Sequence, residues 1–191
     1  MTGFSDAFFM QKALEQANLA YEKDEVPVGA ILVKNNEVLS AAHNLSITKN
    51  DPSAHAEILC LKEAGKVLNN YRLIGTTLYV TLEPCMMCAG AIIHARISRL
   101  VYATSDEKTG FINSRNNLDE NRWLNHKLDI SSGILDRECS KLIKNFFKEL
   151  NDELFSVTLF SYNHEKKEKD YIASSLRFID ITEMNNKEAN D

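Results

Sequence analysis

The spacing of apolar residues along the chain changes between helical and strand-like periods. In residues 5–24 apolar side chains recur every three or four positions, which predicts an amphipathic helix with one buried face. Segments 28–33 and 37–42 are short apolar runs on either side of the polar turn 34–36, which predicts two antiparallel strands. We therefore expect the chain to open with a helix followed by a β-hairpin.

Helical and strand-like segments continue to alternate after the hairpin. Helices are predicted over 54–67, 85–95 and 135–150, and strands over 76–82, 97–103 and 128–130. Asp51 or Ser53, on either side of Pro52, is expected to cap the helix that begins at 54. The alternation predicts an α/β fold of three layers, α/β/α, in which helices cover both faces of a central mixed five-stranded sheet.

The last forty residues differ from the rest in composition. Residues 1–150 are expected to form one domain, and residues 151–191 an acidic extension with nine acidic and five basic side chains. Segments 155–162 and 171–181 have strand-like composition and suggest an added hairpin. A poorly ordered polar extension is the alternative.

Charge and hydropathy exclude several classes of protein. The net charge is −5 and most of it belongs to the extension, so the domain would need a local basic patch to bind a nucleic acid. No apolar run approaches the roughly 18 residues of a membrane span. The amino terminus carries no basic leader with a long apolar run, so the cytoplasm is the expected location.

Two short motifs carry the candidate chemistry. The first is His55-Ala56-Glu57 near the start of a predicted helix, and the second is Pro84-Cys85-Met86-Met87-Cys88 at a strand-to-helix junction. Each is weak alone, because His-x-Glu is common and Cys-x-x-Cys also suits a redox pair or half of a structural zinc site. Together they match the pattern H-x-E…P-C-x-x-C of zinc-dependent nucleobase deaminases.

The ligand types in these motifs suit a catalytic rather than a structural zinc ion. His55, Cys85 and Cys88 supply one imidazole and two thiolates, which leaves the fourth tetrahedral position for water. Such an ion lowers the pKa of water far enough to make hydroxide available at neutral pH. Glu57 is then the candidate general base that moves protons from water to substrate. The reaction class predicted is hydrolytic deamination.

A wider set of motifs resembles the bacterial tRNA-specific adenosine deaminase family over about residues 4–150. The resemblance is carried by Val26-Pro-Val-Gly-Ala30, Asn44, residues 51–58 and 70–73, Leu78-Tyr-Val-Thr-Leu-Glu-Pro-Cys-Met-Met-Cys-Ala-Gly-Ala-Ile-Ile-His94, Lys108-Thr-Gly110 and Asn125-His126. It implies a cytidine-deaminase-like fold, one zinc ion per subunit and a homodimer. It also implies conversion of the wobble adenosine in the anticodon stem-loop of an arginine tRNA to inosine.

The resemblance also implies roles for individual residues. His55, Cys85 and Cys88 would bind zinc and Glu57 would shuttle protons. The expected substrate-binding residues are Asn44 on the flipped base, Val28, Ala56 and Leu82 around its pocket, Asp106 and Lys108 on flanking nucleotides, and Phe147 on the anticodon loop. The chain departs from the family at Ser105, where an Arg is usual, and in its acidic rather than short basic tail.

Two other functions fit the same motifs. One is a zinc-dependent deaminase of a free nucleobase or nucleoside, of the guanine or cytosine type, which shares the metal signature. The other is a non-catalytic binding module stabilised by zinc, although the intact Glu57 argues against it. The small, apolar helix 85–95 is a candidate dimer surface, and burial within one subunit explains its composition equally well.

Overall fold

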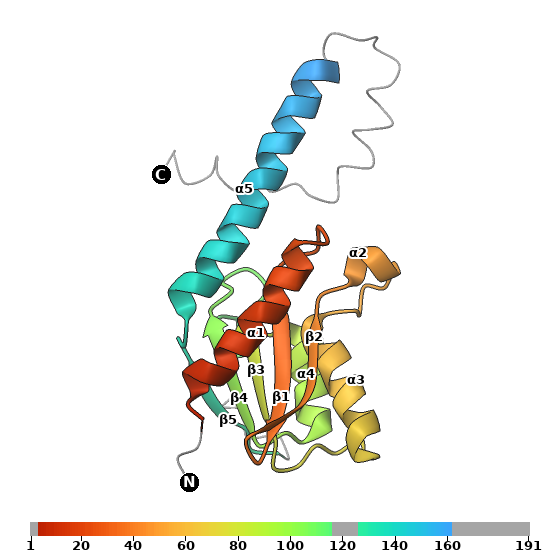
Figure 1. Cartoon of the computed structure of the whole chain (residues 1–191), viewed down its shortest axis with the longest axis vertical. Helices are drawn as coiled ribbons and strands as arrows, with labels where there is room; N and C mark the ends of the chain where they lie inside the picture. Colours follow the sequence, from red (N-terminus) through yellow and green to blue (C-terminus); the bar gives the residue numbers. More distant parts are fainter. Residues whose placement is uncertain (1–3, 116–125, 162–191) are drawn as a thin grey trace. The chain divides into compact units, whose positions relative to one another are not determined.

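Five strands form one mixed sheet in a computed structural model that describes residues 4–115 and 126–161 (Figure 1). The strands are β1 (Gly29–Lys34), β2 (Glu37–His43), β3 (Thr77–Leu82), β4 (Arg99–Thr104) and β5 (Asp129–Ser132). Their order is β2-β1-β3-β4-β5. β1 is antiparallel to both of its neighbours, whereas β3, β4 and β5 are parallel. The mixed five-stranded sheet predicted from the sequence is confirmed.

The helices follow the predicted order with one addition. They are α1 (Asp6–Tyr21), α2 (Ser46–Lys49), α3 (Ala56–Leu68), α4 (Met86–Ala95) and α5 (Asp136–Ser161). The short α2 was not predicted, and it forms where the buried Glu25 carboxylate accepts the backbone N–H groups of Ile47 and Thr48 at 3.1 and 2.6 Å. A carboxylate at this position satisfies N–H groups that have no partner within a helix's first turn.

Alternate residues of the strands pack against different helices. Leu32, Val80 and Tyr102 belong to the core beneath α3 and α4, while Ile31, Tyr79 and Val101 belong to the core beneath α1. This two-residue alternation gives the sheet two apolar faces, so helices must cover both. Figure 1 shows α1 on one face and α3 and α4 on the other, which confirms the three-layer architecture.

Helix α1 lies directly on β1. A Cβ atom at Gly29 would lie 2.1 Å from the carbonyl oxygen of Ala13 and 2.3 Å from the backbone nitrogen of Ala17. Only glycine permits this approach of helix to strand. The N–H of Gly29 also donates to Oγ1 of Thr81 at 3.1 Å, which links β1 to the carboxyl end of β3.

Two predicted boundaries are wrong. The N-cap of α3 is His55, because the Asp51 carboxylate instead accepts the N–H and hydroxyl of Ser53 in a local turn. Helix α5 continues to Ser161, so residues 155–161 do not form the predicted strand. No glycine or proline follows Gly133 in the sequence, so nothing in the chain stops this helix early.

The predicted tail hairpin falls mainly beyond the described residues. Its second strand, 171–181, lies outside them, as does Asn125 of the family motif. The chain divides into two compact units, Met1–Phe147 and Lys148–Asp191. The expected domain boundary at residue 150 and the role of the extension stay predictions. Among the described helices, none has the length and apolar character to cross a membrane.

Candidate active site

The two halves of the sequence signature meet at the starts of two helices. His55 is the N-cap of α3 and Cys85 is the N-cap of α4, and both have extended backbone conformations. Cys88 lies in the first turn of α4 and is buried. The amino-terminal ends of both helices therefore face one cluster, and their partial positive charge favours thiolates and other anions there.

The spacing of the three ligand atoms fits a single tetrahedral ion. Nδ1 of His55 lies 3.8 Å from Sγ of Cys85 and 3.5 Å from Sγ of Cys88. Ordinary Zn–N and Zn–S bond lengths place such atoms roughly 3.6 Å apart around a tetrahedral centre. All three ligand atoms lie within 4.8 Å of one another. One nitrogen and two sulfur donors in this arrangement can hold a metal ion.

The protons of the cluster are unevenly shared between its sulfur atoms. Hydrogen bonds with Cys88 and His55 lower the pKa of Cys85 to about 4, against the effect of burial. The hydrogen bond with Cys85, together with burial, raises the pKa of Cys88, and the pKa of His55 is raised by its hydrogen bond with Cys85. Cys85 is therefore the cysteine that is deprotonated at neutral pH, and a bound cation would displace the proton that remains in the cluster.

Glu57 places a carboxyl group beside this cluster. It follows His55 by two residues on α3, and only 4% of the residue is exposed. Burial raises its pKa, and its side chain also forms a hydrogen bond with Cys88. A buried carboxyl holds its proton more tightly than an exposed one, which suits a group that both accepts and donates protons.

Of the residues predicted to line the base pocket, Asn44 links Val28 to the start of α3. Oδ1 of the buried Asn44 accepts the N–H of Ala56 at 2.8 Å, and the N–H of Asn44 donates to the carbonyl of Val28 at 3.0 Å. Val28 and Ala56 are buried, and Leu82 is partly buried against the same apolar cluster. Asn44 therefore fixes the start of α3, and the base-binding roles of these four residues stay predictions.

The three residues predicted to contact RNA outside the base pocket lie after β4 and on α5. The Asp106 carboxylate accepts the N–H groups of Lys108 and Thr109 at 2.9 and 3.2 Å, so it shapes its own turn, while Lys108 is exposed. Phe147 lies on α5 with its ring edge-on to Phe146 at a centroid distance of 5.5 Å. Contacts of all three with RNA stay predictions.

Glu83 is a buried polar residue that the sequence-based site did not include. It precedes Pro84 and Cys85, is 2% exposed, and accepts hydrogen bonds from several groups in residues 106–114. Burial raises its pKa, but the hydrogen bonds from Ser114, Asn113 and Asp106 outweigh that effect, so the pKa lies below its ordinary value. An acidic residue directly after an apolar strand was the signal that could have identified it.

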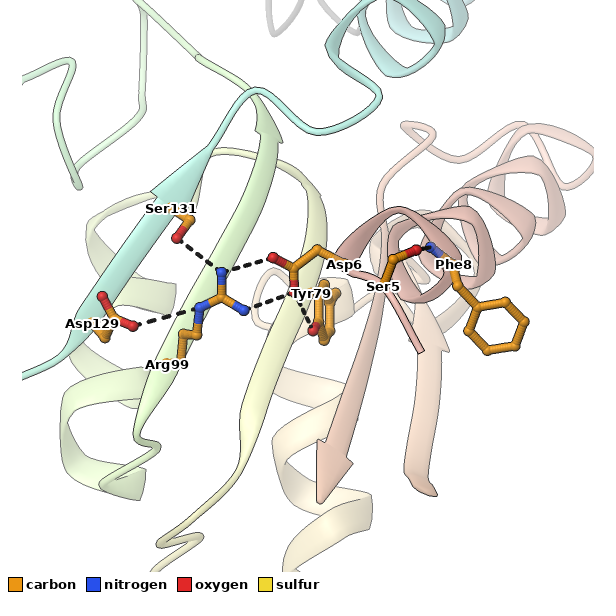
Figure 2. A network of polar contacts seen from close by, with 7 residues as sticks. All are labelled: Ser5, Asp6, Phe8, Tyr79, Arg99, Asp129 and Ser131. Carbon is orange, nitrogen blue, oxygen red and sulfur yellow. Dashed lines mark hydrogen bonds and ion pairs between the residues drawn. The ribbon is translucent and has the colours of Figure 1, made fainter. Parts of the chain in front are cut away.

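A second polar network lies at the opposite end of β4. Arg99, the first residue of β4, forms paired bonds of 2.7 and 2.8 Å with the Asp6 carboxylate, which also accepts the hydroxyl of Tyr79 (Figure 2). Asp129 and Ser131 of β5 also contact the guanidinium group. This network joins the start of α1 to three strands and takes no part in the metal cluster.

The fold and the site together define a deaminase with the cytidine-deaminase-like architecture. The MafB19-like deaminase family matches residues 4–151. The chain is 48% identical over 149 residues to the tRNA-specific adenosine deaminase of Haemophilus influenzae, with 78% of this chain and 86% of the relative covered. The chain belongs to the family of tRNA-specific adenosine deaminases.

Solved structures of deaminases share this fold. A structure from studies of A-to-I editing by tRNA:A34 deaminases at the wobble position of transfer RNA matches with a TM-score of 0.68 and 42% identity, covering 71% of this chain and 98% of that one. A guanine deaminase from Bacillus subtilis matches with a TM-score of 0.52 and 36% identity, covering 53% and 66%. The fold is therefore shared with a deaminase of a free base, but over a smaller part of the chain.

Proposed function

We propose that this protein converts adenosine to inosine at the wobble position of a tRNA, of the arginine type, by hydrolytic deamination. The observation that carries the proposal is the cluster of His55, Cys85 and Cys88 beside the buried Glu57, in a chain of the tRNA-specific adenosine deaminase family. Water supplies the new oxygen, and the amino group leaves as ammonia. The tRNA substrate makes the cytoplasm the proposed location.

The proposed cofactor is one zinc ion per subunit, held by Nδ1 of His55 and the Sγ atoms of Cys85 and Cys88. When bound, zinc acts as a Lewis acid and lowers the pKa of water. Glu57 accepts a proton from the attacking water at its carboxylate and passes it to the ring nitrogen of adenine. A second proton reaches the departing amino group by the same route.

The base would enter beside the start of α3. Because Oδ1 of Asn44 already accepts the N–H of Ala56, the Nδ2 group of Asn44 is the one we assign to donate a hydrogen bond to the flipped base. Val28, Ala56 and Leu82 would provide the apolar walls. Asp106 and Lys108 would contact the nucleotides on either side, and Phe147 the anticodon loop.

A homodimer built on α4 is part of the proposal. Met86 and Met87 at the start of this helix are 66% and 39% exposed, and a Cβ atom at Gly90 would meet nothing within 4 Å. Exposed apolar side chains next to open space on a helix favour packing of a second subunit. Sedimentation analysis of the wild type and of a Met86→Glu variant tests this assembly.

The test of the activity compares substrates directly. Inosine formation in an arginine tRNA anticodon stem-loop is measured beside turnover of free adenosine, guanine and cytidine by the zinc-loaded protein. We expect turnover of the stem-loop alone. The likeness to a guanine deaminase supports the second candidate, a deaminase of free bases. Turnover restricted to the free compounds would establish that candidate and reject the proposed substrate.

A further inference from the structure

We propose that Glu83 is a positioning residue for substrate recognition. Its carboxylate fixes the loop of residues 106–114 against the Cys85 half of the metal cluster, and so sets where Asp106 and Lys108 stand relative to the reacting base. The proposal rests on the proposed function for the role of the loop. The attachment of the loop to Glu83 is independent of it.

The two carboxylate oxygens of Glu83 accept hydrogen bonds from different groups of the loop. Oε1 accepts the backbone N–H groups of Ile112, Asn113 and Ser114 at 3.0, 2.8 and 2.9 Å. Oε2 accepts the N–H of Asp106 at 3.0 Å and the hydroxyl of Ser114. One buried side chain therefore satisfies the backbone at both ends of the loop, and its removal would leave those donors unpaired.

The backbone around Glu83 holds the same loop. The N–H of Phe111 donates to the carbonyl of Pro84 at 2.9 Å, and Cys85 pairs with Gly110 in an antiparallel bridge. A Cβ atom at Gly110 would lie 2.5 Å from both Cδ and Oε2 of Glu83, so loop and carboxylate are packed as closely as glycine allows. The metal ligand Cys85 and the loop are thus parts of one local structure.

Lys108 of the loop and Arg115, the residue after it, are two exposed cations. Nε of Arg115 donates to the backbone carbonyl oxygen of Lys108 at 3.3 Å, which holds Arg115 beside the loop. Cations placed this way suit the phosphates beside a flipped nucleotide. Because Glu83 anchors the loop, a shift of Glu83 moves these cations relative to the metal cluster.

Two variants of Glu83 test its two sets of hydrogen bonds with the loop. Glu83→Gln retains an oxygen for the amides of 112–114 but places an NH₂ group opposite the N–H of Asp106. Glu83→Ala removes both sets of bonds. Asp6→Asn is the matched control, because it weakens a carboxylate network of similar size at the opposite end of β4 (Figure 2).

The first measurement is steady-state kinetics on the anticodon stem-loop, with zinc content determined for each variant. We expect the KM of Glu83→Gln to rise about tenfold with kcat changed less than about threefold, and zinc to stay at the wild-type level. Asp6→Asn should lower thermal stability and leave KM unchanged. A wild-type KM in Glu83→Gln, or an equal rise in Asp6→Asn, would overturn the proposal.

The second measurement is amide hydrogen exchange, which needs no turnover. We expect the amides of 106 and 112–114 to exchange at least about tenfold faster in Glu83→Ala, while Asp6→Asn keeps them protected. If Glu83→Ala does not fold, the amide of 106 in Glu83→Gln gives the same comparison. Wild-type protection in the Glu83 variants would reject the anchoring role, whereas absent stem-loop turnover by the wild type would reject the proposed function alone.

Discussion

Asn44 and Ala56 are joined by a hydrogen bond of 2.8 Å from the backbone N–H of Ala56 to Oδ1 of Asn44. The bond ties the loop after β2 to the first turn of α3, one residue beyond the candidate ligand His55 and one before Glu57. The side-chain oxygen thus serves the fold, and the side-chain nitrogen is left for the proposed contact with substrate.

Because the side-chain oxygen and nitrogen of Asn44 have different roles, we expect Asn44→Asp and Asn44→Ala to have different effects on stability and turnover. The aspartate keeps the acceptor for Ala56 but loses the donor, so we expect near-normal thermal stability and a loss of about 10²–10³-fold in kcat. The alanine variant also leaves the N–H of Ala56 unpaired and should lose about 1–3 kcal/mol of stability. Thermal unfolding and stem-loop kinetics measure the two effects. Substantial activity in Asn44→Asp would remove the residue from the substrate site.

Glu57→Gln should separate metal binding from proton transfer. The three ligand atoms are untouched, so zinc content should stay normal, while turnover should fall by about 10²–10⁴-fold because the amide cannot accept the proton of water. Glu63→Gln is the control, since Glu63 lies on the same helix and makes only an exposed pair with Lys66 at 2.9 Å. Single-turnover assays and metal analysis provide the readouts. A Glu57→Gln variant with wild-type turnover would refute the proton-shuttle role.

Metal removal should make one cysteine selectively reactive. The pKa of Cys85 is lowered to about 4, so its thiolate is present at pH 6, whereas burial raises the pKa of Cys60 and of Cys139 to about 12. We expect iodoacetamide to modify Cys85 first in chelator-treated protein, and added zinc to protect it. Peptide mass spectrometry identifies the site. Preferential modification of Cys60 or Cys139 would contradict this ordering.

The Asp6 and Arg99 pair should make stability depend on acidity. The hydrogen bonds from Arg99 lower the pKa of Asp6 in the folded protein, so the pair stabilises above the ordinary pKa of the carboxyl, and this contribution disappears as pH falls through the lowered value. We expect Asp6→Asn to be less stable than wild type by about 1–2 kcal/mol at pH 7. Denaturant unfolding at several pH values should show the gap closing as the pH falls below the ordinary carboxyl pKa of 3.8.

Local pattern was sufficient for most of the sheet and for the Cys85 and Cys88 half of the candidate metal cluster. The alternation of apolar residues located each strand to within about two positions, and short-range spacing brought Cys85 and Cys88 to one helix turn. The long-range meeting of His55 with these cysteines depends on β3 pairing between β1 and β4, which no local pattern shows. Only the combined motif and the family resemblance indicate this meeting.

The sequence did not predict the parts of the structure that depend on hydrogen bonds from backbone N–H groups. Glu25 and Glu83 both accept backbone N–H groups from segments distant in sequence, and such donors have no signature in the residues that carry them. For the same reason α2 and the loop anchor were not predicted. The composition of 155–161 predicts a strand, but helix α5 continues through this segment, which holds no glycine or proline.

Except for the one from the hydroxyl of Ser114, the hydrogen bonds that Glu83 accepts from the described residues of its loop come from main-chain N–H groups. Every amino acid but proline offers the N–H that such an anchor requires. The cations at 108 and 115 can therefore change by mutation while the loop keeps its place. A deaminase built this way can acquire a new preference for the nucleotides around its target base without redesigning the support of its metal cluster.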